Sequence, residues 1–263
     1  MTAFLAVAIA AMFAAGLTLY SGFGLGTLLL PVFALFYPVE VAVVATAVVH
    51  GANNVFKVLL VGRFADLGVV LRFGLPAILA AIAGATLLGA LAGMHLQLHW
   101  EAGGLSGTTS PLKLTMGALM LLFAAFDLLP WLRALQFERK YLPVGGVLSG
   151  FFGGLSGHQG ALRAAFLVKA GLGTEAFVGT SSVIGLLVDL VRIATYATLI
   201  LWAGGSLELP PGSAPLVATG ILAAFTGVLV GKRFLHKVTM GAVQALTGTL
   251  LLLIAILLGT GLI

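Results

Sequence analysis

The chain has 263 residues, of which 60% are hydrophobic and 8% charged, and its mean hydropathy is +1.18. A soluble domain carries about 25% charged residues, so this composition excludes a soluble globular protein. Stretches such as 250–258 are apolar at every position and lack the alternation of a membrane β-barrel. The composition therefore predicts an all-α integral membrane protein, and the absence of cysteine excludes disulfides and thiolate chemistry.

The formal charge of +5 comes from 13 Lys and Arg residues against 8 Asp and Glu residues. In a membrane protein such an excess is typical of cytoplasmic loops, so we expect contact with membrane lipid and no nucleic-acid partner. No Lys or Arg precedes Lys57, so the basic region of a signal peptide is missing and we expect the first segment to be retained.

Eight apolar stretches follow one another along the chain: 3–37, 39–61, 67–92, 114–129, 143–172, 176–203, 214–231 and 239–263. As one helix the first would be about 52 Å long, against a hydrocarbon core of about 30 Å. Glycine clusters at 21–26 and 153–160 interrupt the first and fifth stretches, and glycine at this density disfavours continuous helix. We therefore predict a break in each.

The basic residues decide whether these two broken stretches cross the membrane or return to the side they entered. If both cross, the ten basic residues outside the membrane interior divide five against five. If both return as hairpins, only Lys113 lies on one face, and the other carries nine: Arg63, Arg72, Arg133, Arg139, Lys140, Lys169, Lys232, Arg233 and Lys237. The second distribution obeys the positive-inside rule. It predicts a multi-pass protein of the cell (inner) membrane with both termini outside the cytoplasm.

The two halves of the sequence resemble each other. A shift of 135 residues pairs polar positions: Ser21 with Ser156, Gly22 with Gly157, Thr46 with Ser181, Asn54 with Asp189 and Lys57 with Arg192. A shift of 124 pairs the segment 113–118 with 237–242. We predict two repeats, 1–129 and 130–263, forming one transmembrane domain. Each would hold a broken-helix hairpin and three crossings, and this odd number inverts the second repeat, as in many secondary transporters.

Four charged residues stand out deep inside apolar segments, where each costs about 2.5 kcal/mol or more: Lys57, Arg163, Asp189 and Arg192. Arg163 follows the second break, and its planar guanidinium suits an oxyanion, although an arginine can also reach the headgroups or bind loop carbonyls. Asp189 and Arg192 share a helical face and are expected to pair. Lys57 has two open interpretations, facing substrate beside Asn53 and Asn54 or extending to the membrane surface.

His158 is the histidine that we predict inside the bilayer, next to Gln159 at the tip of the second hairpin. It could bind an anion, carry a proton or close a tight turn. His50 is expected to pack against a neighbouring helix. The remaining histidines lack metal-ligand spacing, so we predict neither a metal nor a cofactor. Hydrolase, zinc-protease and Walker motifs are missing, and we predict no catalytic residues.

The motif Gly22-Phe23-Gly24-x-Gly26, followed by Pro31, Pro38 and Asn53, resembles the first repeat of the sulfite exporter TauE/SafE family. The segments 150–157 and 175–182 are similar to the second signature of that family, so the resemblance covers almost the whole chain. His158-Gln159-Gly160 departs from the small residues that relatives often carry there, which leaves the substrate open.

The resemblance implies a secondary transporter that exports a small anion, sulfite or a short organosulfonate, by alternating access around a midplane site. A passive anion channel on the same scaffold is the alternative, and a scaffold without transport would leave the embedded charges unexplained. The oligomeric state is open, a homodimer included. The candidate substrate-binding residues are Ser21, Gly22, Asn53, Asn54, Lys57, Ser156, Gly157, His158, Gln159, Arg163, Ser181, Asp189 and Arg192.

Overall fold

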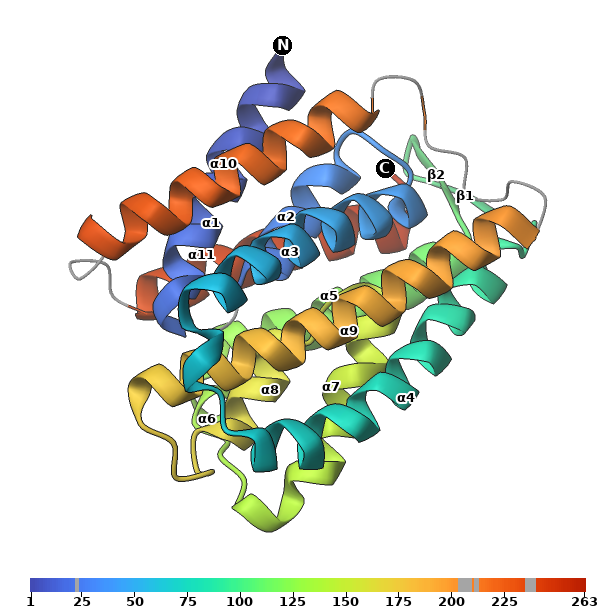
Figure 1. Cartoon of the computed structure of the whole chain (residues 1–263). Helices are drawn as coiled ribbons and strands as arrows, with labels where there is room; N and C mark the ends of the chain where they lie inside the picture. Colours follow the sequence, from blue (N-terminus) through green and yellow to red (C-terminus); the bar gives the residue numbers. More distant parts are fainter. Residues whose placement is uncertain (22–23, 203–209, 211–212, 235–239) are drawn as a thin grey trace.

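Apolar helices make up most of the chain in the computed structural model (Figure 1), which describes residues 1–21, 24–202, 210, 213–234 and 240–263. The longer helices are α1 (Thr2–Ser21), α2 (Leu25–Ala34), α3 (Val39–Val61), α4 (Leu67–Ala92), α5 (Pro111–Leu128), α7 (Leu142–Ser156), α8 (Gly160–Leu167), α9 (Thr174–Trp202), α10 (Ser213–Phe234) and α11 (Met240–Thr260). Five helices of the described residues are long and apolar enough to cross a membrane. The predicted helical membrane class is confirmed.

The short elements lie in the connections between these helices. They are η1 (Gly62–Phe64), β1 (Leu98–Ala102), β2 (Leu105–Thr109), α6 (Pro130–Arg133) and η2 (Arg139–Tyr141). The strands form an antiparallel hairpin turned by Gly103 and Gly104, both at positive φ. The sequence predicts only a long connection in this region and gives no prediction of the hairpin.

The second predicted break is present and is shorter than its glycine cluster, because α7 ends at Ser156, Gly157 has a φ of 83° and α8 begins at Gly160. In the first broken stretch α1 ends at Ser21 and α2 begins at Leu25 after Gly24, whose φ is 122°, and residues 22 and 23 lie outside the described part of the chain. The sequence predicts that Gly153 and Gly154 interrupt the helix, but both lie inside α7. A Cβ at Gly154 would lie 2.1 Å from the carbonyl oxygen of Ala81 in α4, so this glycine serves close helix packing.

Residues 1–129 and 130–263 contact each other mainly through long helices that cross from one half to the other. α4 lies along α7 and α10 lies along α1, so in each case a long helix of one half covers the first arm of the other half's broken segment. α5 packs against α11, and α3 packs against α9. The broken segments are thereby held between the halves, with α3 and α9 at the centre (Figure 1).

Interactions in the connections define two ends of the helix bundle. At one end the Trp100 indole of β1 donates to the Thr260 carbonyl at 2.7 Å, next to the C-terminus. At the other end the Phe137 amide donates to the Ala165 carbonyl at 3.1 Å, and the Asp66 amide donates to the Thr180 hydroxyl at 2.9 Å. Lys113 lies near the first end, and Arg63 and Arg133 lie at the second.

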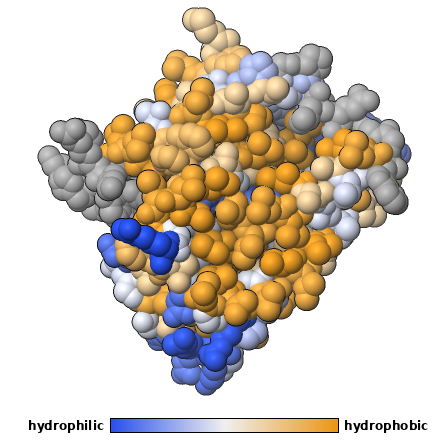
Figure 2. Space-filling model, viewed as in Figure 1, coloured by the Kyte–Doolittle hydropathy of each residue, from blue (hydrophilic) through white to orange (hydrophobic). Residues whose placement is uncertain are grey.

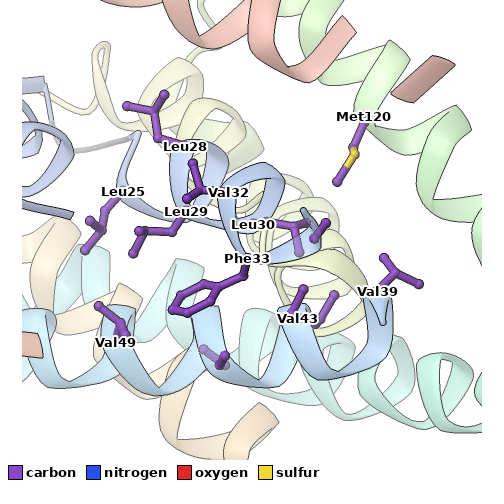
Figure 3. Close-up of a cluster of buried hydrophobic side chains, with 14 of the residues drawn as sticks. Leu25, Leu28, Leu29, Leu30, Val32, Phe33, Val39, Val43, Val49 and Met120 are labelled. Carbon is purple, nitrogen blue, oxygen red and sulfur yellow. The ribbon is translucent and has the colours of Figure 1, made fainter. Parts of the chain in front are cut away.

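The surface is apolar over most of the face seen in Figure 2, with hydrophilic residues gathered at its lower end. Leu59, Leu79 and Leu201 are at least 70% exposed, as befits side chains that contact lipid rather than water. Inside, α2 is buried along its whole length. Figure 3 shows its leucines and Phe33 packed against α3, with Met120 approaching from α5.

Candidate functional site

A stripe of polar side chains follows one face of α3. Thr46, His50, Asn53 and Lys57 recur at helical spacing, and none exceeds 8% exposure. The side-chain oxygen of Thr46 and both amide atoms of Asn53 have no hydrogen-bond partner among the described residues. A buried polar group without a partner is costly. This stripe therefore marks a place where a polar ligand would restore lost hydrogen bonds.

Asp189 of α9 is fully buried and joins the two halves of the protein. Its Oδ2 lies 2.7 Å from Nδ1 of His50 and accepts a hydrogen bond from Nδ2 of Asn54 at 2.7 Å. Its Oδ1 accepts from Nε2 of Gln159 at 3.0 Å and lies 2.8 Å from Nη2 of Arg192. The predicted pairing with Arg192 is present, and it is one of four interactions that hold this carboxylate.

Arg163 extends from α8 across to α9 and is 2% exposed. Its Nε donates to the Ser181 hydroxyl at 2.9 Å, and its Nη1 donates to Oε1 of Gln159 at 2.9 Å. A Cβ at Gly185 would lie 3.2 Å from this Nη1 and 2.8 Å from Nδ2 of Asn54. Because Gly185 has no side chain, the Arg163 guanidinium and the Asn54 amide can both approach α9 at this position.

The tips of the two broken segments meet beside this network. A Cβ at Gly26 would lie 3.2 Å from the Gly157 carbonyl oxygen, and one at Gly157 would lie 2.8 Å from Nη1 of Arg192. His158 Nδ1 lies 3.0 Å from the Ser156 hydroxyl, while its Nε2 has no partner among the described residues. The breaks therefore bring backbone and polar side chains from both halves to one buried place.

The charges of this site do not balance. Three basic side chains, Lys57, Arg163 and Arg192, and one carboxylate, Asp189, are buried in this region, and Lys57 lies within electrostatic range of Arg163. Burying a charge costs several kcal/mol unless an opposite charge and hydrogen bonds offset it. The basic side chains of this region thus outnumber its carboxylates.

Most of the residues singled out from the sequence lie in this one network. Asn53, Asn54, Lys57, Ser156, Gly157, His158, Gln159, Arg163, Ser181, Asp189 and Arg192 are all buried. Gly22 and the Ser21 side chain lie outside the described part of the chain.

Of the two open interpretations of Lys57, its exposure of only 5% favours the protein interior. One expectation needs correction: His158 is not the only histidine inside a membrane segment, because His50 lies within α3 and its Nδ1 lies 2.7 Å from Oδ2 of Asp189. The sequence shows only that His50 stands four residues before Asn54 on one helical face, since its partner Asp189 comes 139 residues later.

No group of three His, Cys, Asp or Glu residues that could hold a metal ion occurs among the described residues.

The fold and the site define a multi-pass helical membrane protein with a buried polar centre that contains several basic side chains. Residues 4–258 match the family model described as sulfite exporter TauE/SafE. The chain therefore belongs to the sulfite exporter TauE/SafE family. A search of curated protein sequences found no match.

Proposed function

We propose that the protein exports a small sulfur oxyanion, sulfite or a short organosulfonate, by alternating access around the site between α3, α8 and α9. The observation that carries this proposal is the burial of two guanidinium groups, Arg163 and Arg192, in the polar network where the two broken segments meet. A guanidinium offers a planar set of donors that matches the oxygens of such an anion. An anion leaving an inside-negative cell gains about 2.3 kcal/mol per charge for each 100 mV, so export needs no ATP.

We further propose that the halves 1–129 and 130–263 are inverted repeats that rock against each other. The exchanged helix pairs α4 with α7 and α10 with α1 support this relation. Asn54 and Asp189, which the shift of 135 residues makes equivalent, hydrogen-bond to each other. Contact between equivalent residues is expected on the axis that relates two repeats.

The proposed orientation places the end with Arg63, Arg133, Arg139 and Lys140 in the cytoplasm and the end with Lys113 outside. The positive-inside rule supports this assignment. It would put the C-terminus outside as well, since Gly261 accepts a hydrogen bond from the strand that precedes Lys113. We propose that the protein lies in the lipid of the cell (inner) membrane. A homodimer is also proposed, and a measurement of the molecular mass in detergent tests it.

Sulfite flux in liposomes tests the proposed function. The wild-type chain should give flux that saturates with sulfite and is stimulated by sulfite on the opposite side, as alternating access requires. Arg163→Ala should lose most of this flux, and Arg63→Ala, which removes an exposed arginine, should keep it. Undiminished flux in Arg163→Ala would refute the assigned site, and flux without saturation or counterflow would refute alternating access.

A further inference from the structure

A cavity of about 130 Å³ lies between α5, α6 and α8, at the end of the bundle that carries Arg133. It reaches the surface, since Gln136 on its rim is exposed and Arg133 is half-buried. Asp127 lines it and is 5% exposed, so the cavity brings a carboxylate to a place that the remaining protein covers. The residues that matter here are Asp127, Arg133, Gln136, Ala164, Ala165 and Gln244. Four of the lining residues are polar, Asp127, Arg133, Gln136 and Gln244, and the rest are apolar. These four side chains are the polar partners that water in the cavity would need.

The pocket beside α2 in the other half, which Leu28, Val32 and Leu250 line, has only apolar residues. The shift of 135 residues relates Ala164 and Ala165 of α8 to Leu29 and Leu30 of α2, and both leucines are fully buried.

The shift of 124 residues extends this difference to the neighbouring helices. It relates Gln244 to Met120, and it relates Asp127 to Leu251. Met120 and Leu251 are fully buried in the same apolar cluster as the two leucines of α2 (Figure 3). Small and polar residues in one half thus stand where large apolar residues fill the other half. The packing is closed at Leu29 and Leu30 of α2, whereas Ala164 and Ala165 of α8 line the cavity.

The cavity ends near the cation-rich site. Phe126 lines the cavity, and its ring centroid lies 6.1 Å from that of Phe123, one turn further along α5. The Phe123 ring in turn stacks on His158, with centroids 4.7 Å apart. His158 is the residue whose buried Nε2 has no partner among the described residues. Two aromatic rings therefore separate the cavity from the tip of the broken segment.

We propose that this cavity is the aqueous vestibule through which a small hydrated anion approaches the site, and that the structure holds the protein open to the Arg133 end and closed at α2. The inference rests on the proposed function, because a vestibule has meaning only if an anion uses the site. Arg133 offers the anion its first positive charge, and the Phe123–His158 stack forms the remaining barrier. In the opposite state the packing around α2 must open instead.

Cysteine accessibility tests the asymmetry directly, because the chain contains no native cysteine. Ala165→Cys places a thiol in the cavity, Leu30→Cys places one at the equivalent closed position, and Gln136→Cys supplies an exposed reference. A membrane-impermeant thiol reagent is added to each side of sealed vesicles in turn. Each variant must match the wild-type elution profile and must react fully once it is denatured, which shows that its thiol is intact.

We expect Ala165→Cys to react from the same side as Gln136→Cys and at a rate within about tenfold of it. Leu30→Cys should react at least about 100-fold more slowly from either side, because a buried thiol waits for local opening of the structure. Equal rates for Ala165→Cys and Leu30→Cys would overturn the proposal. Reaction of Ala165→Cys only from the side opposite to Gln136→Cys would also overturn it.

A second variant asks whether the space is used in transport. Ala165→Leu introduces the residue of the closed half and fills the cavity, so it should lose sulfite flux, while Ala83→Leu on the exposed face of α4 should retain it. Wild-type flux in Ala165→Leu would contradict a vestibule. If Arg163→Ala abolishes flux but Ala165→Cys is unreactive, the proposed function stands and the vestibule fails. If Ala165→Cys reacts but Arg163→Ala transports normally, the assigned anion site fails.

Discussion

Replacing Asp189 by Asn should destabilise the protein strongly, although the two side chains have almost the same shape. The carboxylate is fully buried, lies 2.8 Å from the Arg192 guanidinium and interacts with three further polar side chains. Its removal leaves the buried Arg192 guanidinium without its carboxylate partner. Breaking a buried ion pair by removing one partner costs about 3–5 kcal/mol.

For a chain of this size that loss corresponds to a fall in Tm of about 10 °C. Thermal unfolding of the purified protein in detergent measures it. Glu138→Gln is the matched control, since the Glu138–Lys140 ion pair has the same length, 2.8 Å, but both side chains are more than 60% exposed. The control should change the free energy of unfolding by less than about 1 kcal/mol. If Asp189→Asn lowers the Tm no more than Glu138→Gln does, the reasoning is refuted.

Two further predictions concern the close packing of α7. Gly150→Ala should lower the Tm and shift the elution profile, because its Cβ would lie 2.1 Å from the Ala77 carbonyl oxygen. Gly259→Ala is the control and should leave the Tm unchanged, because its Cβ would meet nothing within 4 Å. Equal changes in Tm for the two variants would contradict the close packing of α7 against α4. Tyr196→Phe should cost about 1 kcal/mol in thermal unfolding, because the hydroxyl donates to the Gly154 carbonyl, and an unchanged Tm would show that this bond contributes nothing.

The membrane class, the second break and the burial of the charged residues could be predicted from the sequence because each follows from a local rule. Runs of apolar residues specify spanning helices, and charges within such runs must find partners. Arg163, Asp189 and Arg192 were identified on that cost alone, and the structure brings all three into one buried network.

The features that the sequence could not supply depend on contacts between distant segments. His50 looked like an ordinary buried side chain because its partner, Asp189, comes 139 residues later. Gly153 and Gly154 resemble helix breakers because nothing in the sequence says that Val188 of α9 packs against the first and Ala81 of α4 against the second. The difference between Ala165 and Leu30 carries no signal until the structure shows a cavity at one position and a filled core at the other.

The central claim is that the Arg163 guanidinium binds the transported anion, and calorimetric titration of sulfite into the purified protein tests it most directly. Wild-type protein and Arg63→Gln should bind sulfite at a saturable site. Arg163→Gln should weaken the affinity by about tenfold or more, since a hydrogen bond to a charged group contributes about 1.5–3 kcal/mol. An unchanged Kd in a folded Arg163→Gln protein would contradict the account.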